Sequence, residues 1–354
     1  MNAIRKRIFQ ILLFIGIGIL LLALVFWHQN KAYQEQCRLE GIPPEQCRLL
    51  DKLLFDFSSV RLEWMILVWA AFTISILLRA WRWQVLLEPM GYRARLGNAF
   101  WTIVLGYFAN LGLPRMGEIV RAGVLARYER IPVERVMGTL VVDRLMDMVC
   151  LSLVVGLAFL WEADTLWAFL QQNRGSEVPF WKKPAFLVFL AFLASLGGAA
   201  WFFRHKIVRL TLFKRFAGLL TGFLEGLRSV LQLKRAGIFW ACSLGIWLMF
   251  YLQTWFNLRA FGPTAHLSWD AALMVFVFGT LGFVIPSPGG MGSFHALAIA
   301  GLTVYAIRSD DAFSYANIAF FAVQILYNVL GGLLALVLLP VLNRPTLKEV
   351  SQHG

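Results

Sequence analysis

Residues 105–127 read LGYFANLGLPRMGEIVRAGVLAR. The first half is apolar enough to enter a bilayer, but Pro114 interrupts it, and charged side chains follow: Arg115, Glu118, Arg121 and Arg127. Proline removes a helical hydrogen bond and disfavours helix at the residue before it. In lipid, the freed backbone groups need partners in the protein or in a water-lined cavity. The stretch therefore predicts two half-helices whose tip, near Gly117, lies at membrane depth.

The composition of the whole chain is that of a membrane protein. Of its 354 residues, 59% are hydrophobic and 15% are charged, whereas about a quarter of the residues in soluble domains are charged. A helix needs about 20 apolar residues to cross the hydrocarbon layer. About six runs predict full crossings, namely residues 8–27, 62–78, 136–161, 184–203, 237–258 and 314–340. The predicted fold class is an all-α polytopic membrane protein.

A second broken region resembles the first. Residues 277–300 read VFGTLGFVIPSPGGMGSFHALAIA, so each region has an apolar half, a proline turn, a Met-Gly pair and a second half. The predicted tip residues are Asn110, Pro114 and Gly117 in the first region, and Pro286, Pro288, Gly289, Gly290 and Gly292 in the second. Each region lies between two predicted crossings, and their charges place them on opposite sides of the membrane. This is the pattern of an inverted repeat with re-entrant hairpins, which makes eight or more membrane segments in total.

The repeat sets the expected domain organisation. Residues 1–59 are expected to form an anchor helix and an outer loop, residues 60–340 the membrane domain, and residues 341–354 a cytoplasmic tail. Within the membrane domain, residues 60–161 form repeat one, residues 162–236 linker helices, and residues 237–340 repeat two.

The basic residues predict the orientation. With both termini in the cytoplasm and both broken regions as hairpins, 22 Lys and Arg residues lie on the cytoplasmic side and 9 on the outer side. This distribution obeys the positive-inside rule. A basic cytoplasmic face also attracts anionic lipid headgroups, so membrane lipids, in particular anionic ones, are the expected partners.

Several ionisable residues lie at predicted membrane depth, where they are costly and usually functional. Asp143 and Asp147 share one helix face, and Arg144 is free to pair with either or with a group elsewhere. Arg79 and Arg82 are expected at the cytoplasmic end of the second crossing, as interface anchors or headgroup ligands. The predicted headgroup site comprises Arg79, Arg82, Arg115, Glu118, Arg121, Asp143, Arg144 and Asp147. No motif for a metal, a nucleotide or another cofactor is present.

Cys37 and Cys47 share the predicted outer loop. An oxidising exterior would permit a disulfide between them, so the pair is a candidate disulfide.

Four motifs in order resemble a known family. They are RAWRWQVLL (79–87), NLGLPRMGEIVRAGVLAR (110–127), TLVVDRLMDM (139–148) and PSPGGMGSFHALA (286–298). Together they resemble the flippase-like membrane domain of the lysylphosphatidylglycerol synthase/flippase family, also called the multiple peptide resistance factor family. The resemblance covers about residues 60–340. It implies a multi-pass protein of a prokaryotic cytoplasmic membrane, here in a stand-alone form without the synthase domain.

The leading functional hypothesis is a non-enzymatic translocase for a phospholipid or another lipid with a phosphate headgroup. In this hypothesis Arg115, Arg121 and Arg144 hold the phosphate, while Glu118, Asp143 and Asp147 pair with these bases or with a cationic headgroup. One alternative is a secondary transporter of a small anion. Another is an intramembrane enzyme or an accessory subunit of a cell-envelope lipid or glycosyl transferase. Homo-oligomers and a cell-envelope enzyme are candidate protein partners, and nucleic acid is not expected.

Overall fold

The computed structural model describes Leu20 and residues 22–31, 33–35, 37–39, 47–112, 116–162, 233, 235–285 and 287–343. All of them belong to one unit, residues 1–162 with 233–354. Every regular element among the described residues is helical, which confirms the all-α prediction for this part of the chain. The main helices are α2 (Leu49–Ser58), α3 (Leu62–Leu87), α4 (Leu96–Gly112), α5 (Met116–Glu129), α6 (Val133–Trp161), α11 (Ala236–Ala260), α12 (Trp269–Val284), α13 (Ser293–Thr303), α14 (Ser309–Phe320) and α15 (Asn328–Leu342).

Short elements join or follow several of these helices. Three of them are 3₁₀ turns, η2 (Glu88–Met90), η4 (Gly262–Thr264) and η5 (Pro288–Gly290). The fourth, η6 (Phe321–Tyr327), is a π-helix that links α14 to α15 without a break.

Three of the described helices are long and apolar enough to cross a membrane. They are residues Leu62–Met90, Ala236–Ala260 and Ser309–Leu342, and they coincide with three of the predicted crossings. Helix α6 has 29 residues but carries five charged side chains within its length. The predicted crossings at 8–27 and 184–203, and the predicted linker helices, lie wholly or largely outside the described residues.

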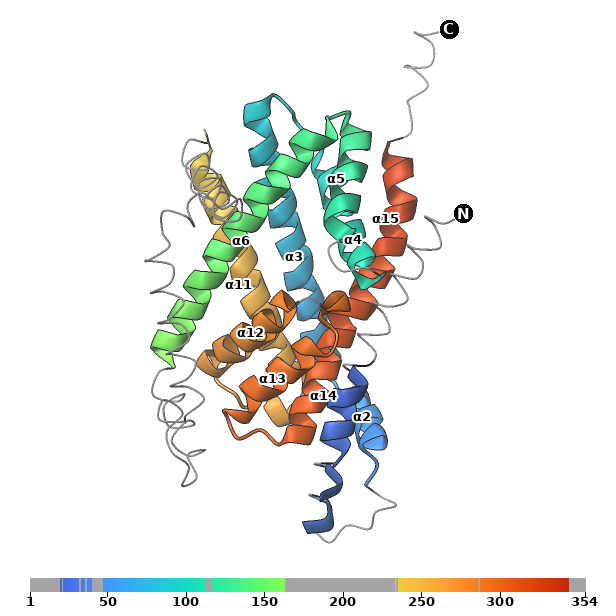
Figure 1. The fold of residues 1–354 in the computed structure, drawn as a ribbon, viewed down its shortest axis with the longest axis vertical. Coiled ribbons are helices and arrows are strands. Elements are labelled where there is room, and N and C mark those ends of the chain that lie inside the picture. The colour runs from blue at the N-terminus through green and yellow to red at the C-terminus, as the bar shows by residue number, and fades with distance from the viewer. Residues whose placement is uncertain are drawn as a thin grey trace, which may run out of the picture. The chain divides into compact units, whose positions relative to one another are not determined.

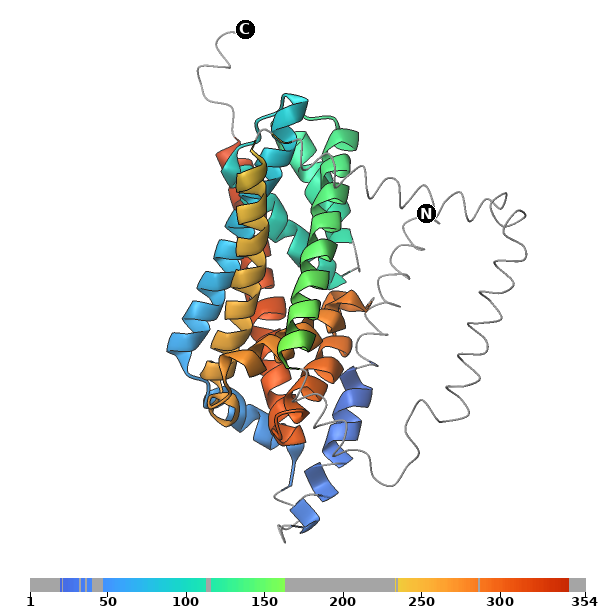
Figure 2. The ribbon, with the colours of Figure 1, turned by 90° about the vertical axis from the view of Figure 1, so that its left-hand side faces the viewer.

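The long helices run in alternating directions along one bundle. In Figure 1, α3 and the α14–α15 helix run from the lower end to the upper end, while α6 and α11 run downward. Helix α11 packs along α3 and also contacts α6, and Figure 2 shows these three helices beside one another. The second predicted crossing was too short at its carboxyl end, because α3 continues from Leu78 to Leu87.

Each broken region forms a helical hairpin. Helix α4 starts at the upper end in Figure 1, and α5 returns to it, whereas α12 and α13 start and finish at the lower end. In each hairpin, a glycine allows the two helices to pack closely against each other. A Cβ on Gly117 would lie 2.2 Å from the carbonyl oxygen of Gly106, and one on Gly282 would lie 2.6 Å from the Cα of Phe294.

The tips of the two hairpins adjoin one another. The turn η5 packs against α4, and a Cβ on Gly289 would lie 3.6 Å from the side chain of Leu111. Gly289, Gly290 and Gly292 all have positive φ angles, a conformation that glycine adopts without the steric penalty of a side chain. The proline-rich tip of the second hairpin is thus held close to the end of α4.

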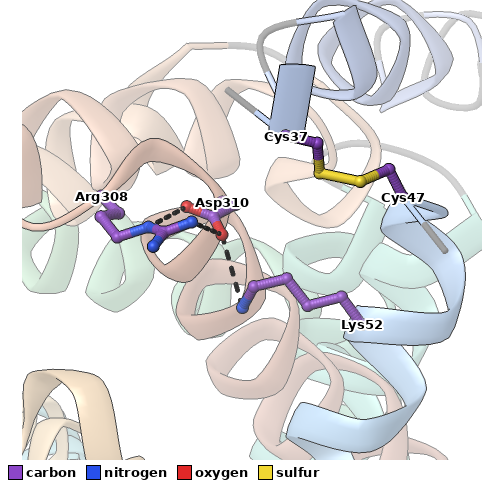
Figure 3. Close-up of a disulfide and its surroundings, with 5 residues drawn as sticks. All are labelled: Cys37, Cys47, Lys52, Arg308 and Asp310. Atoms are coloured by element: carbon purple, nitrogen blue, oxygen red, sulfur yellow. Dashed lines mark hydrogen bonds and ion pairs between the residues drawn. A yellow bond between two sulfur atoms is a disulfide. The ribbon is translucent and has the colours of Figure 1, made fainter. Parts of the chain in front are cut away.

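A disulfide and an ion-pair cluster hold α2 at the lower end of the bundle. Cys37 and Cys47 are joined by a disulfide (Figure 3). Lys52 on α2 lies 2.6 Å from Asp56 and 2.7 Å from Asp311, the latter in the first turn of α14. Asp310 lies 3.7 Å from Lys52 and also pairs with Arg308.

Candidate functional site

Five charged side chains meet inside the upper half of the bundle. Arg79 and Arg82 come from α3, Arg121 from α5, and Asp143 and Asp147 from α6. We call these five residues the buried ion network. The i,i+3 and i,i+4 spacings place Arg79 with Arg82, and Asp143 with Asp147, on single helix faces. Because α3, α5 and α6 pack together there, the two faces meet.

Asp143 is the centre of the buried ion network. Its Oδ2 lies 3.1 Å from Arg79 Nη1 and 3.1 Å from Arg121 Nη2, and its Oδ1 accepts a hydrogen bond from Arg82 Nη2. The residue has no exposed surface. A buried carboxylate is costly to desolvate unless it is paired, so contact with three guanidinium groups allows Asp143 to stay ionised there.

Asp147 completes the network one turn further along α6. Its two carboxylate oxygens lie 2.7 Å from Arg79 Nη1 and 2.7 Å from Arg82 Nη2. Arg79 and Arg82 therefore each bridge both carboxylates. The sequence placed these arginines at the end of a crossing as interface anchors or headgroup ligands. The structure shows that α3 continues past both arginines to Leu87 and that both are buried, so the predicted end of the crossing was too early. Their role as headgroup ligands stays a prediction.

Neutral side chains from other positions support the arginines. Ser243 on α11 accepts a hydrogen bond of 3.1 Å from Arg82 Nη1. The guanidinium of Arg121 lies over the ring of Trp83, 4.2 Å from its centroid, which is a cation–π contact. The Trp83 indole donates to Thr139 at 2.8 Å. Sequence reasoning missed Ser243 and Thr139, although a hydroxyl residue inside an apolar helix is a usable signal.

The buried ion network has one more positive charge than negative charges. Three guanidinium groups face two carboxylates, and all three arginines are at least 95% buried. The Nε atoms of Arg79, Arg82 and Arg121 have no hydrogen-bond partner within the described part of the chain. Arginine binds phosphate through its parallel N–H groups, so this arrangement has both the charge and the donors for one more anionic group.

A second charged pair lies on the outer side of helices α5 and α6. Arg144 Nη2 on α6 is 2.7 Å from Glu118 Oε1 on α5, and the two side chains are 45% and 32% exposed. We call Glu118 and Arg144 the surface pair. The sequence hypothesis made Arg121 and Arg144 phosphate ligands and paired Glu118 and Asp143 with these bases. The structure pairs Arg144 with Glu118 and Arg121 with Asp143, and the phosphate role of both arginines stays a prediction.

The predicted tip residues have structural roles where they are described. Asn110 Oδ1 accepts a hydrogen bond from the backbone N–H of Gly117 at 2.8 Å, which closes the first hairpin. In the second tip, the hydroxyl groups of Ser287 and Ser293 lie 2.7 Å apart. Pro288 begins η5. Pro114, Arg115 and Pro286 lie outside the described residues, so the predicted role of Arg115 stays a prediction.

The fold and the charged site define a polytopic helical membrane protein. The sequence profile of the lysylphosphatidylglycerol synthase TM region family matches residues 49–331. This match covers most of the chain, which therefore belongs to that family, and it confirms the predicted resemblance. A relative named UPF0104 membrane protein MJ1595, from Methanocaldococcus jannaschii, is 33% identical over 102 residues. That alignment covers 28% of this chain and 30% of the relative. No solved structure matches this chain.

Proposed function

We propose that this protein moves lipids with a phosphate headgroup from one leaflet of the membrane to the other, without a chemical reaction. The observation that carries the proposal is the buried ion network, an arginine-rich polar site inside a bundle of apolar helices. Ionisable groups in membrane segments usually mark the pathway of a substrate or ion. A phosphate is the lipid group that such a site would attract.

The hairpins support a translocation pathway because they are too short to span a membrane. At 1.5 Å per residue, α4 and α5 extend about 25 Å and about 21 Å, and α12 and α13 about 24 Å and about 17 Å. All four are shorter than the hydrocarbon core of about 30 Å. We therefore interpret them as re-entrant hairpins of an inverted repeat, entering from opposite sides and meeting within the membrane.

The charge of the buried ion network fits a phosphodiester headgroup. A phosphodiester carries one negative charge, which equals the excess positive charge of the three arginines over the two aspartates. Within the buried ion network, Arg121 is the arginine with the fewest carboxylate contacts, since among the described residues it pairs with Asp143 alone. We expect the phosphate to bind Arg121 first, because this contact displaces the fewest existing ion pairs.

The orientation that we propose follows from the two ends of the bundle. The disulfide lies at the lower end, near the start of α14, and disulfides persist on the oxidising side of a cytoplasmic membrane. The opposite end carries the connections from α3 to α4 and from α5 to α6, with basic residues that include Arg93, Arg95 and Arg130. The positive-inside rule assigns this end to the cytoplasm, with both chain termini on the same side.

The test is translocation by the purified protein in liposomes. Fluorescent phospholipids are placed in both leaflets, and an impermeant reductant bleaches only those that reach the outer leaflet. We expect the wild type to allow bleaching beyond the outer-leaflet fraction, and Arg121→Gln to reduce the rate at least tenfold. Arg95→Gln, at an exposed position, serves as the matched control and should translocate normally.

Two outcomes would contradict the proposal. The first is bleaching confined to the outer leaflet for anionic, zwitterionic and aminoacylated lipids, with wild-type protein that is folded by its melting curve. The second is equal translocation by the wild type and Arg121→Gln. Uptake of radiolabelled phosphate by the same liposomes separates the alternative, a transporter of small anions, because lipid movement would then be absent.

A further inference from the structure

We propose that the surface pair is the entrance through which a headgroup reaches the buried ion network, and that it selects zwitterionic headgroups. In this arrangement the phosphate of the headgroup binds Arg144 and its ammonium group binds Glu118. The inference rests on the proposed function and deepens it, because it names the route and the class of lipid.

The surroundings of Arg144 are apolar and exposed. On α6, Met137, Val141 and Met148 lie at helical spacings from Arg144 and are themselves exposed, by 38%, 57% and 60%. In a membrane protein, an exposed apolar stripe of this kind faces lipid. Arg144 therefore places a guanidinium group in a stripe that is otherwise hydrophobic. Neighbouring Ile119 on α5 is also exposed.

A charged pair facing lipid is not explained by stability. Ionisable side chains in membrane segments generally face the interior of the bundle, because contact with hydrocarbon is unfavourable for them. The surface pair is half exposed, whereas the side chains of the buried ion network are exposed by 14% or less. The position of the surface pair thus indicates that a molecule outside the bundle must reach it.

The residues of the surface pair lie next to members of the buried ion network along the same two helices. Glu118 is one helical turn before Arg121 on α5, and Arg144 follows Asp143 on α6. Helices α5 and α6 therefore each supply one residue to the surface pair and one or more to the network. A headgroup that enters between these two helices meets the surface pair first and Arg121 next.

The selectivity follows from counting paired charges. The surface pair is one ion pair between one acid and one base. A zwitterionic headgroup can replace that ion pair with two, so no charge is left unpaired at membrane depth. An anionic headgroup without an ammonium group would pair Arg144 and leave Glu118 without a partner, which is unfavourable in a medium of low dielectric constant.

The experiment compares translocation of zwitterionic and anionic lipids by the full chain in liposomes, with fluorescent phosphatidylcholine and phosphatidylglycerol as the probes. We expect the wild type to move phosphatidylcholine faster. Glu118→Gln should lower the ratio of the two rates about tenfold, because the ammonium group loses its partner. Glu88→Gln is the matched control. Glu88, in η2 after α3, also forms an ion pair, at 3.6 Å from Arg235 just before α11, and its side chain is 29% exposed, but neither residue belongs to α5 or α6.

Glu118→Gln leaves Arg144 without its partner, so a second variant controls for misfolding from this unpaired charge. The double substitution Glu118→Gln, Arg144→Gln removes both charges, and it should also lose the preference for phosphatidylcholine. The inference fails if either folded variant keeps the wild-type ratio of rates, if Glu88→Gln changes the ratio as much, or if the wild type moves phosphatidylglycerol faster. Absence of translocation by the wild type would instead overturn the proposed function itself.

Discussion

Asp143 is the residue on which the buried ion network depends most. Its carboxylate contacts Arg79, Arg82 and Arg121 and is buried. Asp143→Asn would leave three guanidinium groups with the single carboxylate of Asp147. Removing one partner from a buried ion pair costs about 3–5 kcal/mol, and we expect a loss of this size in the free energy of unfolding. The midpoint of thermal denaturation in detergent would measure it.

Asp147→Asn is the matched comparison for this prediction. Asp147 contacts two arginines instead of three, and its side chain is 14% exposed instead of 1%. We therefore expect about half the loss seen for Asp143→Asn. Equal melting temperatures for the two variants would show that Asp143 is not the centre of the network.

Spacing in the sequence identified the members of this network but not their partners. The i,i+4 spacing of Asp143 and Asp147 is enough to place them on one face. It cannot show that this face meets Arg79 and Arg82, because that depends on how α3 and α6 pack. For the same reason the sequence left open whether Arg144 pairs with its neighbours or with a group elsewhere, and the structure pairs it with Glu118 on α5.

At the scale of the elements, the hairpins depend on close contact between helices. A Cβ on Gly117 would lie 2.2 Å from the Gly106 carbonyl oxygen and 2.7 Å from Asn110, and backbone cannot move aside as a flexible side chain can. We expect Gly117→Ala to separate α4 from α5 and to lower the free energy of unfolding by at least about 3 kcal/mol, the upper end for overpacked cores. Thermal denaturation of the purified variant would test this.

Gly123→Ala on the same helix is the control for Gly117→Ala. Among the described residues, no atom beyond its chain neighbours and the backbone of its own helix lies within 4 Å of the Cβ that it would add. Alanine is the better helix former by about 1 kcal/mol, so this variant should be as stable as the wild type or slightly more so. A loss of stability equal to that of Gly117→Ala would mean that helix α5 tolerates no substitution, and the argument from close contact would fail.

At the same scale, Lys52 links helix α2 to helix α14 through ion pairs. Burial lowers the pKa of the Lys52 ammonium group, but hydrogen bonds to Asp311 and Asp56 outweigh this effect, so its pKa lies above the ordinary value of 10.5. Lys52→Met would leave these carboxylates without their shared cation. Since hydrogen bonds between charged groups contribute about 1.5–3 kcal/mol, we expect a loss of about 2 kcal/mol, measured by thermal denaturation.

The pH dependence of this loss has a definite sign. A group whose pKa is raised on folding stabilises the protein fully below its unfolded pKa, and that stability disappears as pH rises through the folded pKa. The difference between the wild type and Lys52→Met should therefore be constant between about pH 7 and pH 9 and decrease only above about pH 10.5. If the stability difference between the two proteins already decreased between about pH 7 and pH 9, the ion-pair explanation would be contradicted.

The hairpins could be predicted from sequence, whereas the shape of the last helix could not. Proline and glycine mark the tips because both act on the local backbone. The π-helix η6 carries no such signal. It contacts α3, where the Trp69 indole donates a hydrogen bond to the carbonyl of Ala322 within η6, and the sequence does not show such a contact. Element boundaries failed for a similar reason at α3, where ion pairs to another helix allow the helix to continue.

At the scale of the whole molecule, the two ends of the bundle differ in chemistry. The lower end holds the disulfide and the carboxylates around Lys52. The upper end holds the arginines of the short connections into α4 and α6. Between the two ends lie the buried ion network and the adjoining hairpin tips. If the protein moves lipids as we propose, this position gives a headgroup polar partners between the two ends, away from both membrane surfaces.

This arrangement predicts which positions an impermeant thiol reagent reaches in intact cells. His266→Cys, exposed between η4 and α12, should be labelled from outside, whereas Arg93→Cys should be labelled only after permeabilisation. Met116→Cys, at the start of α5, tests whether the first hairpin is re-entrant. If α4 and α5 each crossed the membrane, Met116→Cys would lie outside and be labelled like His266→Cys. We expect it to resist labelling, because helices of about 25 Å and about 21 Å reach only part of the way.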